Sequence, residues 1–270
     1  MNASPKTQTS EWMKGFAGKM GTTALKVTLV GFISLVALRG FAAESVEPSS
    51  KAYAALLEKY VLDDGVRYAQ WHGNAEDRMA LKGVLEQWST IDPASLDRGG
   101  ATAFLINLYN AAIIHQVLEH FPLKSVRDIG LMPFALFRQD IVILNGSKVS
   151  LDAIEKEKLL EDYFDPRIHF AVNCASVSCP PLRAEPFTAA DLERQLNEQS
   201  ILFANSRRAA RVIPDTDATA YSELFKWYAD DFPGDDPAEY LNRFRDDPLP
   251  VGNAIRWISY NWSLNDVNPQ

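Results

Sequence analysis

The chain contains few residues of several kinds, and each shortage excludes a class of protein. Only two of its 270 residues are cysteines, which is too few for a disulfide-rich scaffold or a four-cysteine zinc site. The 27 basic residues are outnumbered by 35 acidic ones, giving a net charge of −8, so a nucleic-acid-binding surface of clustered Lys and Arg is not expected. Phosphate-binding loops, dinucleotide glycine patterns, Gly-x-Ser-x-Gly motifs and internal repeats are also missing. What is present, 47% hydrophobic and 23% charged residues, is typical of an ordinary globular protein.

The one long apolar run near the N-terminus is typical of a signal for export. Twelve residues, 27–38, follow three lysines and precede a small-residue exit, after which we expect cleavage at Ala42. An uncleaved anchor and a plain amphipathic helix are the alternatives, but 12 residues span only about 18 Å of the roughly 30 Å hydrocarbon core. We therefore predict a signal peptide over 1–42 and a periplasmic or secreted protein that contacts membrane only through an uncleaved N-terminal segment.

The remaining residues, 43–270, are predicted to form a single domain. They carry 22 basic and 34 acidic residues, a net charge of −12, and are enough for one well-buried core. Apolar spacing and capping residues predict a hairpin over 140–150 and strands over 168–172 and 211–213. They predict helices over 50–60, 76–88, 102–120, 150–160, 188–205 and 223–230, with another opening at 236. The expected fold is a mostly helical α+β domain packed around a small antiparallel sheet.

The most informative segment, 165–183, brings both cysteines close to a histidine. The predicted strand that carries His169 opens into the turn Cys174-Ala-Ser-Val-Ser-Cys179, and strand ends that enter loops commonly display reactive groups. One cysteine could be a nucleophile activated by a histidine, the two could form a disulfide, or both could be ordinary buried thiols. The spacing alone leaves these three interpretations open. Further polar residues of this segment are candidates for binding substrate or orienting the loop: Asn173, Ser176 and Ser178.

Two asparagines lie within the most apolar predicted helix. Asn107 and Asn110 are three residues apart and share one face. Their amides need partners if they are buried. They either hold the backbone of a neighbouring loop, or orient a catalytic loop and bind a peptide backbone.

Metal and cofactor sites are not expected. The four histidines lie at positions 72, 115, 120 and 169, and only 115 and 120 are near each other, at a spacing that does not share a helix face well.

Several separated motifs resemble the family called domain of unknown function 547, in the family's order and over about residues 50–266. They are Phe104-Leu-Ile-Asn-Leu-Tyr-Asn-Ala111, Phe121-Pro-x-x-Ser125, Ser150-Leu-Asp-x-Ile-Glu155, Asp165-Pro-Arg-x-His169-Phe, Asn173-Cys174-x-Ser-x-Ser-Cys-Pro, Phe225-x-Trp-Tyr-x-x-Asp-Phe232 and Tyr260-Asn-Trp-Ser-Leu-Asn265.

The resemblance implies a fold similar to papain-type cysteine peptidases, with Cys174 at the family's cysteine position and His169 and Glu155 as its charged partners. The chain departs from the family in having Lys156 where members often carry His, and Asn261 where they often carry Asp. If that His were catalytic, this member would be impaired.

A fully extended chain would separate His169 from Cys174 by about 16 Å, far beyond the roughly 3 Å of a nucleophile–base contact. The pair therefore requires a turn at Asn173, or His115 as a substitute base.

Two functions follow as hypotheses. In the first, the protein catalyses cysteine-dependent acyl transfer or hydrolysis on a peptide or small amide substrate, as a cysteine peptidase or amidase does. In the second, it is a non-catalytic peptide- or thiol-binding module with a disulfide between Cys174 and Cys179. A dithiol redox protein is a weaker third hypothesis, because four residues separate the cysteines instead of two.

Overall fold

A computed structural model describes residues 50–267, which belong to one compact unit. The predicted signal peptide, 1–42, lies outside the described residues.

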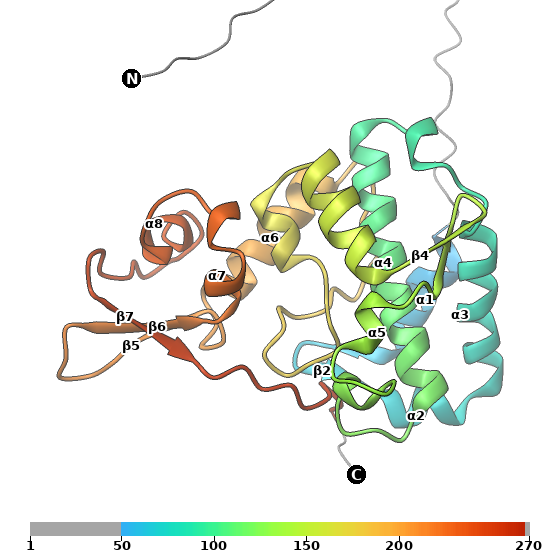
Figure 1. Cartoon of the computed structure of the whole chain (residues 1–270), viewed down its shortest axis with the longest axis horizontal. Coiled ribbons are helices and arrows are strands. Elements are labelled where there is room, and N and C mark those ends of the chain that lie inside the picture. The colour runs from blue at the N-terminus through green and yellow to red at the C-terminus, as the bar shows by residue number, and fades with distance from the viewer. Residues whose placement is uncertain (1–49, 268–270) are drawn as a thin grey trace, which may run out of the picture. The chain divides into compact units, whose positions relative to one another are not determined.

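The N-terminal part is built around one long buried helix. Helices α1 (Lys51–Tyr60), α2 (Tyr68–Gly73) and α3 (Ala75–Trp88) precede α4 (Arg98–His120), which contacts both α2 and α3 (Figure 1). The short strands β1 (Val61–Leu62) and β2 (Gly65–Val66) pair between α1 and α2. Within the described part of the chain, α4 is long and apolar enough to cross a membrane, and 89% of its apolar window is buried inside the protein. This packing is that of a core helix, as its all-round apolar surface predicts.

The middle of the chain contains the predicted hairpin. After the 3₁₀ turns η1 (Pro93–Ser95) and η2 (Val126–Asp128) and helix α5 (Ala135–Arg138), strands β3 (Val142–Leu144) and β4 (Ser147–Val149) pair antiparallel. Asn145 and Gly146 connect them with φ angles of 50° and 72°. Positive φ at both positions is the primed turn that matches strand twist, so the hairpin prediction is confirmed. The π-helix η3 (Ala153–Asp162) follows.

The strand predicted over 168–172 is wrong. The structure forms a 3₁₀ helix, η4 (Pro166–Phe170), and Asp165 Oδ1 caps it by accepting the backbone N–H of Arg167 at 2.9 Å. Proline fixes φ at the first position of such a turn. The run is too short for apolar periodicity to distinguish a strand from a buried helical turn.

The C-terminal part contains the largest sheet of the described residues. Helix α6 (Leu192–Ala204) leads to β5 (Ala210–Val212) and β6 (Ala218–Ser222), followed by α7 (Leu224–Trp227), η5 (Ala229–Asp231), α8 (Pro237–Leu241) and β7 (Ala254–Ile258). Strand β6 pairs antiparallel with β5 and parallel with β7 (Figure 1). The protein therefore has a mixed α+β fold, but its strands form three small sheets, one of them mixed. A papain-like fold stays a prediction.

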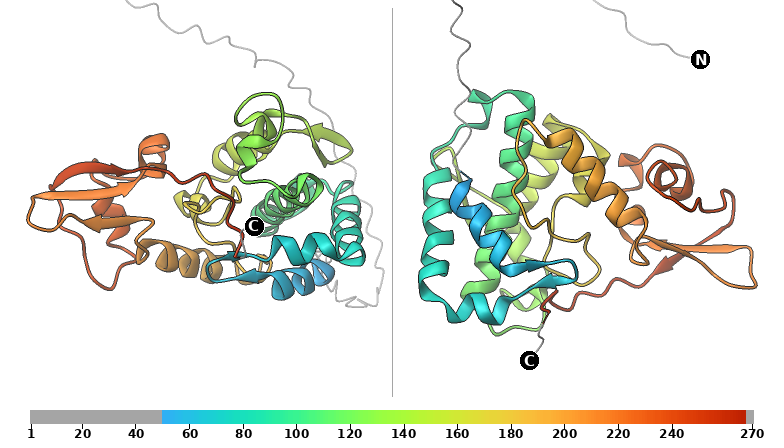
Figure 2. Two further views of the ribbon diagram at one scale, coloured as in Figure 1. Left: turned by 90° about the horizontal axis from the view of Figure 1, so that it is seen from below. Right: turned by 180° about the vertical axis from the view of Figure 1, so that it is seen from behind.

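The segment after β7 connects distant parts of the described chain. It runs back toward β2 (Figures 1 and 2), where Asn265 O accepts the backbone N–H of Val66 at 2.9 Å. On the way, Ser263 O accepts the N–H of Val177 at 2.9 Å. Tyr260 and Trp262 are thereby held beside the loop that carries the cysteines.

Candidate functional site

A cleft of about 290 Å³ brings together residues that lie far apart in the sequence, from Tyr109 to Trp262. Side chains from α4, α5, η3, η4, α7, the cysteine loop and the segment after β7 line it. Three of the four residues predicted to be catalytic, Cys174, His169 and Glu155, are among them. The others are Tyr109, Phe134, Phe137, Arg138, Asp152, Lys156, Val172, Cys179, Pro180, Leu224, Trp227, Tyr228, Tyr260 and Trp262.

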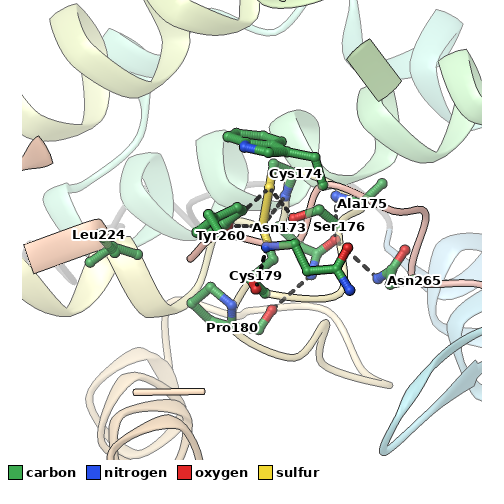
Figure 3. Close-up of a disulfide and its surroundings, with 12 residues drawn as sticks. Asn173, Cys174, Ala175, Ser176, Cys179, Pro180, Leu224, Tyr260 and Asn265 are labelled. Carbon is green, nitrogen blue, oxygen red and sulfur yellow. Dashed lines mark hydrogen bonds between the residues drawn. A yellow bond between two sulfur atoms is a disulfide. The ribbon is translucent and has the colours of Figure 1, made fainter. Parts of the chain in front are cut away.

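The two cysteines form a disulfide in the wall of this cleft (Figure 3). Cys174 Sγ lies 3.2 Å from the hydroxyl of Ser176 and 3.4 Å from that of Tyr260. Of the three interpretations left open by the sequence, the structure therefore contains the disulfide. In this form neither sulfur is a free nucleophile, because the thiolate is the reactive species.

Buried amides fix the backbone around the disulfide. Asn110 donates to the carbonyl of Ala171 at 2.9 Å and accepts the backbone N–H of Asn173 at 2.8 Å. The Asn173 side chain donates to the carbonyl of Pro180 at 2.7 Å and accepts the N–H of Ala175 at 2.8 Å. Asn110 thus joins the start of the loop to α4, and Asn173 joins the start of the loop to its end, so the two amides position the loop.

The remaining polar candidates also contact backbone. Asn107 donates to the carbonyl of Phe187 at 2.7 Å and accepts that residue's N–H at 2.9 Å. Ser178 Oγ accepts the N–H of Asn261 at 2.8 Å, attaching the loop to the segment after β7. The side chains of Asn107 and Ser178 therefore hold loops in place.

His169 lies in the cleft wall with a carboxylate partner. The residue is 2% exposed, and its Nε2 lies 2.8 Å from Asp231 Oδ2. Burial lowers the pKa of His169 below its ordinary value, although the charges of Glu155 and Asp231 oppose the shift. The imidazole is therefore neutral at pH 7 and donates its Nε2–H to Asp231.

Glu155 is a buried carboxylate held by tyrosines. It is 7% exposed and accepts the hydroxyl of Tyr228 at 2.8 Å. The hydroxyl of Tyr109 hydrogen-bonds the same group. Burial first, and then the charge of Glu155, raise the pKa of both tyrosines above the ordinary value, so both remain hydrogen-bond donors. Glu155 lies on η3, and π-helical turns are rare and often occur at functional sites.

Three aromatic residues, Trp227, Tyr260 and Trp262, form an aromatic wall of the cleft, and the sequence did not mark them as site residues. Trp227 and Trp262 are stacked with centroids 5.8 Å apart, and Tyr260 lies 4.9 Å and 4.6 Å from them respectively. Trp227 is 46% exposed although it lines a cleft. Their only sequence signal was membership of the late motifs Phe225–Phe232 and Tyr260–Asn265.

His115 does not lie in this cleft. It lines a separate cavity of about 220 Å³ with Leu85, Ala112 and Ile141 among its neighbours. The structure therefore does not bring this predicted substitute base to Cys174. Within residues 50–267, no three His, Cys, Asp or Glu side chains are arranged to hold a metal ion.

The lowered pKa of His169 predicts a pH dependence of stability. An unfolded histidine titrates near pH 6.5, and the folded group titrates lower, so below about pH 6.5 the unfolded state binds more protons. The contribution of His169 to the free energy of unfolding is therefore fully present above that pH and is lost as the pH falls. We expect His169→Gln to lose less free energy of unfolding than the wild type between pH 7 and 5, measured by urea unfolding. His115, whose pKa burial also lowers, is common to both proteins. Equal losses in the two proteins would contradict a lowered pKa for His169.

The fold and site define a small α+β protein with an aromatic cleft, a buried carboxylate and a disulfide. Residues 93–203 match the sequence model described as "Protein of unknown function, DUF547". This match supports the resemblance to the family for the motifs between Phe104 and Pro180, and the motifs after residue 203 lie outside the matched stretch. Neither the curated proteins nor the solved structures provide a match.

Proposed function

We propose that the protein is a binding module whose cleft takes a short peptide or a small amide or thiol ligand. The observation that carries this proposal is the state of Cys174, whose sulfur is bonded to Cys179. The histidine of the cleft wall, His169, has Asp231 as its partner. A nucleophilic cysteine needs a free sulfur in hydrogen-bond reach of its base. The disulfide removes the free sulfur, and the residues around it remain as a binding surface.

The lining of the cleft supports the same conclusion. Ligand sites are concave, mostly apolar and equipped with a few convergent polar groups. Trp227, Tyr260 and Trp262 offer ring faces for apolar side chains or peptide planes. Glu155, fixed by Tyr228, offers an acceptor for a ligand N–H.

Acyl transfer is the second candidate, because Cys174, His169 and Glu155 line one cleft and Asp231 orients the imidazole. It requires reduction of the disulfide first. The position at which family members often carry His is Lys156 in this chain, and Lys156 also lines the cleft, paired with Asp152 at 3.2 Å. The chain thus has a lysine in an ion pair where the resemblance implies an imidazole, and this difference favours the binding module.

We also propose an extracytoplasmic location. The disulfide supports it, because such bonds persist in oxidising compartments and are rare in reducing ones.

The binding proposal predicts that ligands contact the aromatic wall without being cleaved. Blocked tripeptide amides with Leu, Phe or Lys at the centre are titrated into ¹⁵N-labelled protein. We expect saturable shifts of the indole N–H signals of Trp227 and Trp262 and intact peptides by mass spectrometry. Trp227→Ala should weaken binding about fivefold or more.

The matched control is Trp257→Ala. Trp257 is also partly exposed, at 38%, but lies on β7 and not in the cleft lining, so binding should be unchanged. Absence of saturable shifts with every peptide would contradict the proposal. Cleavage by reduced protein that disappears in His169→Ala would establish acyl transfer in its place.

A further inference from the structure

The two sulfurs of the disulfide have different surroundings. Cys179 is 3% exposed, whereas Cys174 is only partly buried, and both line the cleft. Thiol–disulfide exchange depends on access to the sulfur that is attacked. A thiol that enters the cleft therefore reaches Cys174 more readily than Cys179.

Hydrogen-bond donors converge on the sulfur of Cys179. The backbone N–H of Cys174 donates to it at 3.0 Å, and the hydroxyl of Tyr260 donates to it at 3.2 Å (Figure 3). Cys174 Sγ lies farther from the same hydroxyl, at 3.4 Å, and its nearer polar contact is the hydroxyl of Ser176, at 3.2 Å. Burial raises the pKa of Tyr260 above its ordinary value, which keeps this hydroxyl protonated.

A positive charge lies on the same side. The guanidinium of Arg208 donates to the carbonyl oxygen of Cys179 at 3.4 Å. Donors and cations stabilise a thiolate, and a more stable thiolate is a better leaving group. The surroundings of Cys179 are thus suited to the charge that appears when the disulfide opens.

We propose that the Cys174–Cys179 disulfide is reactive, and that a thiol ligand in the cleft is captured on Cys174 with Cys179 as the leaving thiolate. The inference rests on the proposed binding function and adds the chemical class of ligand. The ligand thiol loses its proton to water, and its sulfur forms a bond to Cys174 Sγ. The Cys174–Cys179 bond breaks, and its electron pair stays on Cys179. The ligand sulfur is oxidised and Cys179 is reduced, so no other oxidant takes part. Attack by Cys179 on the mixed disulfide releases the ligand again.

Glutathione, a tripeptide thiol, is the probe. Oxidised protein is incubated with glutathione, exchange is stopped with acid and N-ethylmaleimide, and adducts are located by peptide mass spectrometry. We expect glutathione on Cys174 and maleimide on Cys179. Tyr260→Phe keeps the ring but removes the donor, and should slow adduct formation about tenfold. Tyr163→Phe, outside the cleft, should react at the wild-type rate.

Glutathione on Cys179, no adduct, or an unchanged rate in Tyr260→Phe would overturn the inference. If Tyr260→Phe folds poorly, the position of the adduct in the wild-type protein still tests the inference. Titration with S-methylglutathione, which cannot exchange, separates the two proposals. Saturable shifts of Trp227 and Trp262 without a glutathione adduct would retain the binding function and reject the reactive disulfide. An adduct on Cys174 without saturable binding would support the reactive disulfide and reject the binding function.

Discussion

Replacement of Phe170 by Ala is expected to lower the free energy of unfolding by about 3–5 kcal/mol. The side chain is fully buried, with ring centroids of Phe203 and Phe232 at 5.0 Å and 5.9 Å. Removing it leaves a cavity among close-packed rings that cannot collapse onto one another without moving η4 or α6. Chemical denaturation followed by circular dichroism measures the change.

Phe164→Ala provides the control. Phe164 is 50% exposed, so its loss should remain below about 1 kcal/mol. A loss for Phe170→Ala as small as that of the control would show that the apolar cluster around Phe170 is loosely packed. The cluster also contains Phe225, Tyr240 and Leu241.

The second large effect is expected at Asn110. Asn110→Leu removes the partners of the Asn173 N–H and the Ala171 carbonyl, both in buried backbone. Each unpaired buried group costs about 1–3 kcal/mol, so the free energy of unfolding should fall by about 2–6 kcal/mol in urea or guanidinium unfolding.

Asn205→Leu is the matched control for this change. The Asn205 side chain also makes backbone hydrogen bonds, with Ile201, Phe244 and Asp246, but it is exposed. Water can replace those bonds, and the loss should be about 1 kcal/mol or less. Equal losses in the two variants would mean that the cysteine loop does not depend on its anchor to α4.

Local patterns predicted the elements whose cause is local. The primed turn at Asn145-Gly146, the long apolar helix and the cap at Asp236 are all determined by neighbouring residues, and the structure contains them. Strand β7 was not predicted, because its five residues do not alternate clearly and its partner β6 lies far away in the chain.

The candidate site was predicted in the same uneven way. One segment and one neighbouring helix contributed Cys174, Cys179, His169 and Glu155, and these residues do line one cleft. Tyr260 lies 86 residues from Cys174 in sequence, and only long-range backbone pairing brings it there. No local periodicity encodes such a contact, so the aromatic wall and the carboxylate partner of His169 could not be found from spacing.

Residues after position 203 complete the cleft. The matched stretch, 93–203, includes both cysteines, His169 and Glu155, but not the aromatic wall or Asp231. A fragment ending at residue 203 would leave the disulfide without the hydroxyl of Tyr260 and the imidazole without its acceptor. The cleft is therefore complete only in a longer stretch of chain than the one that matches the family model.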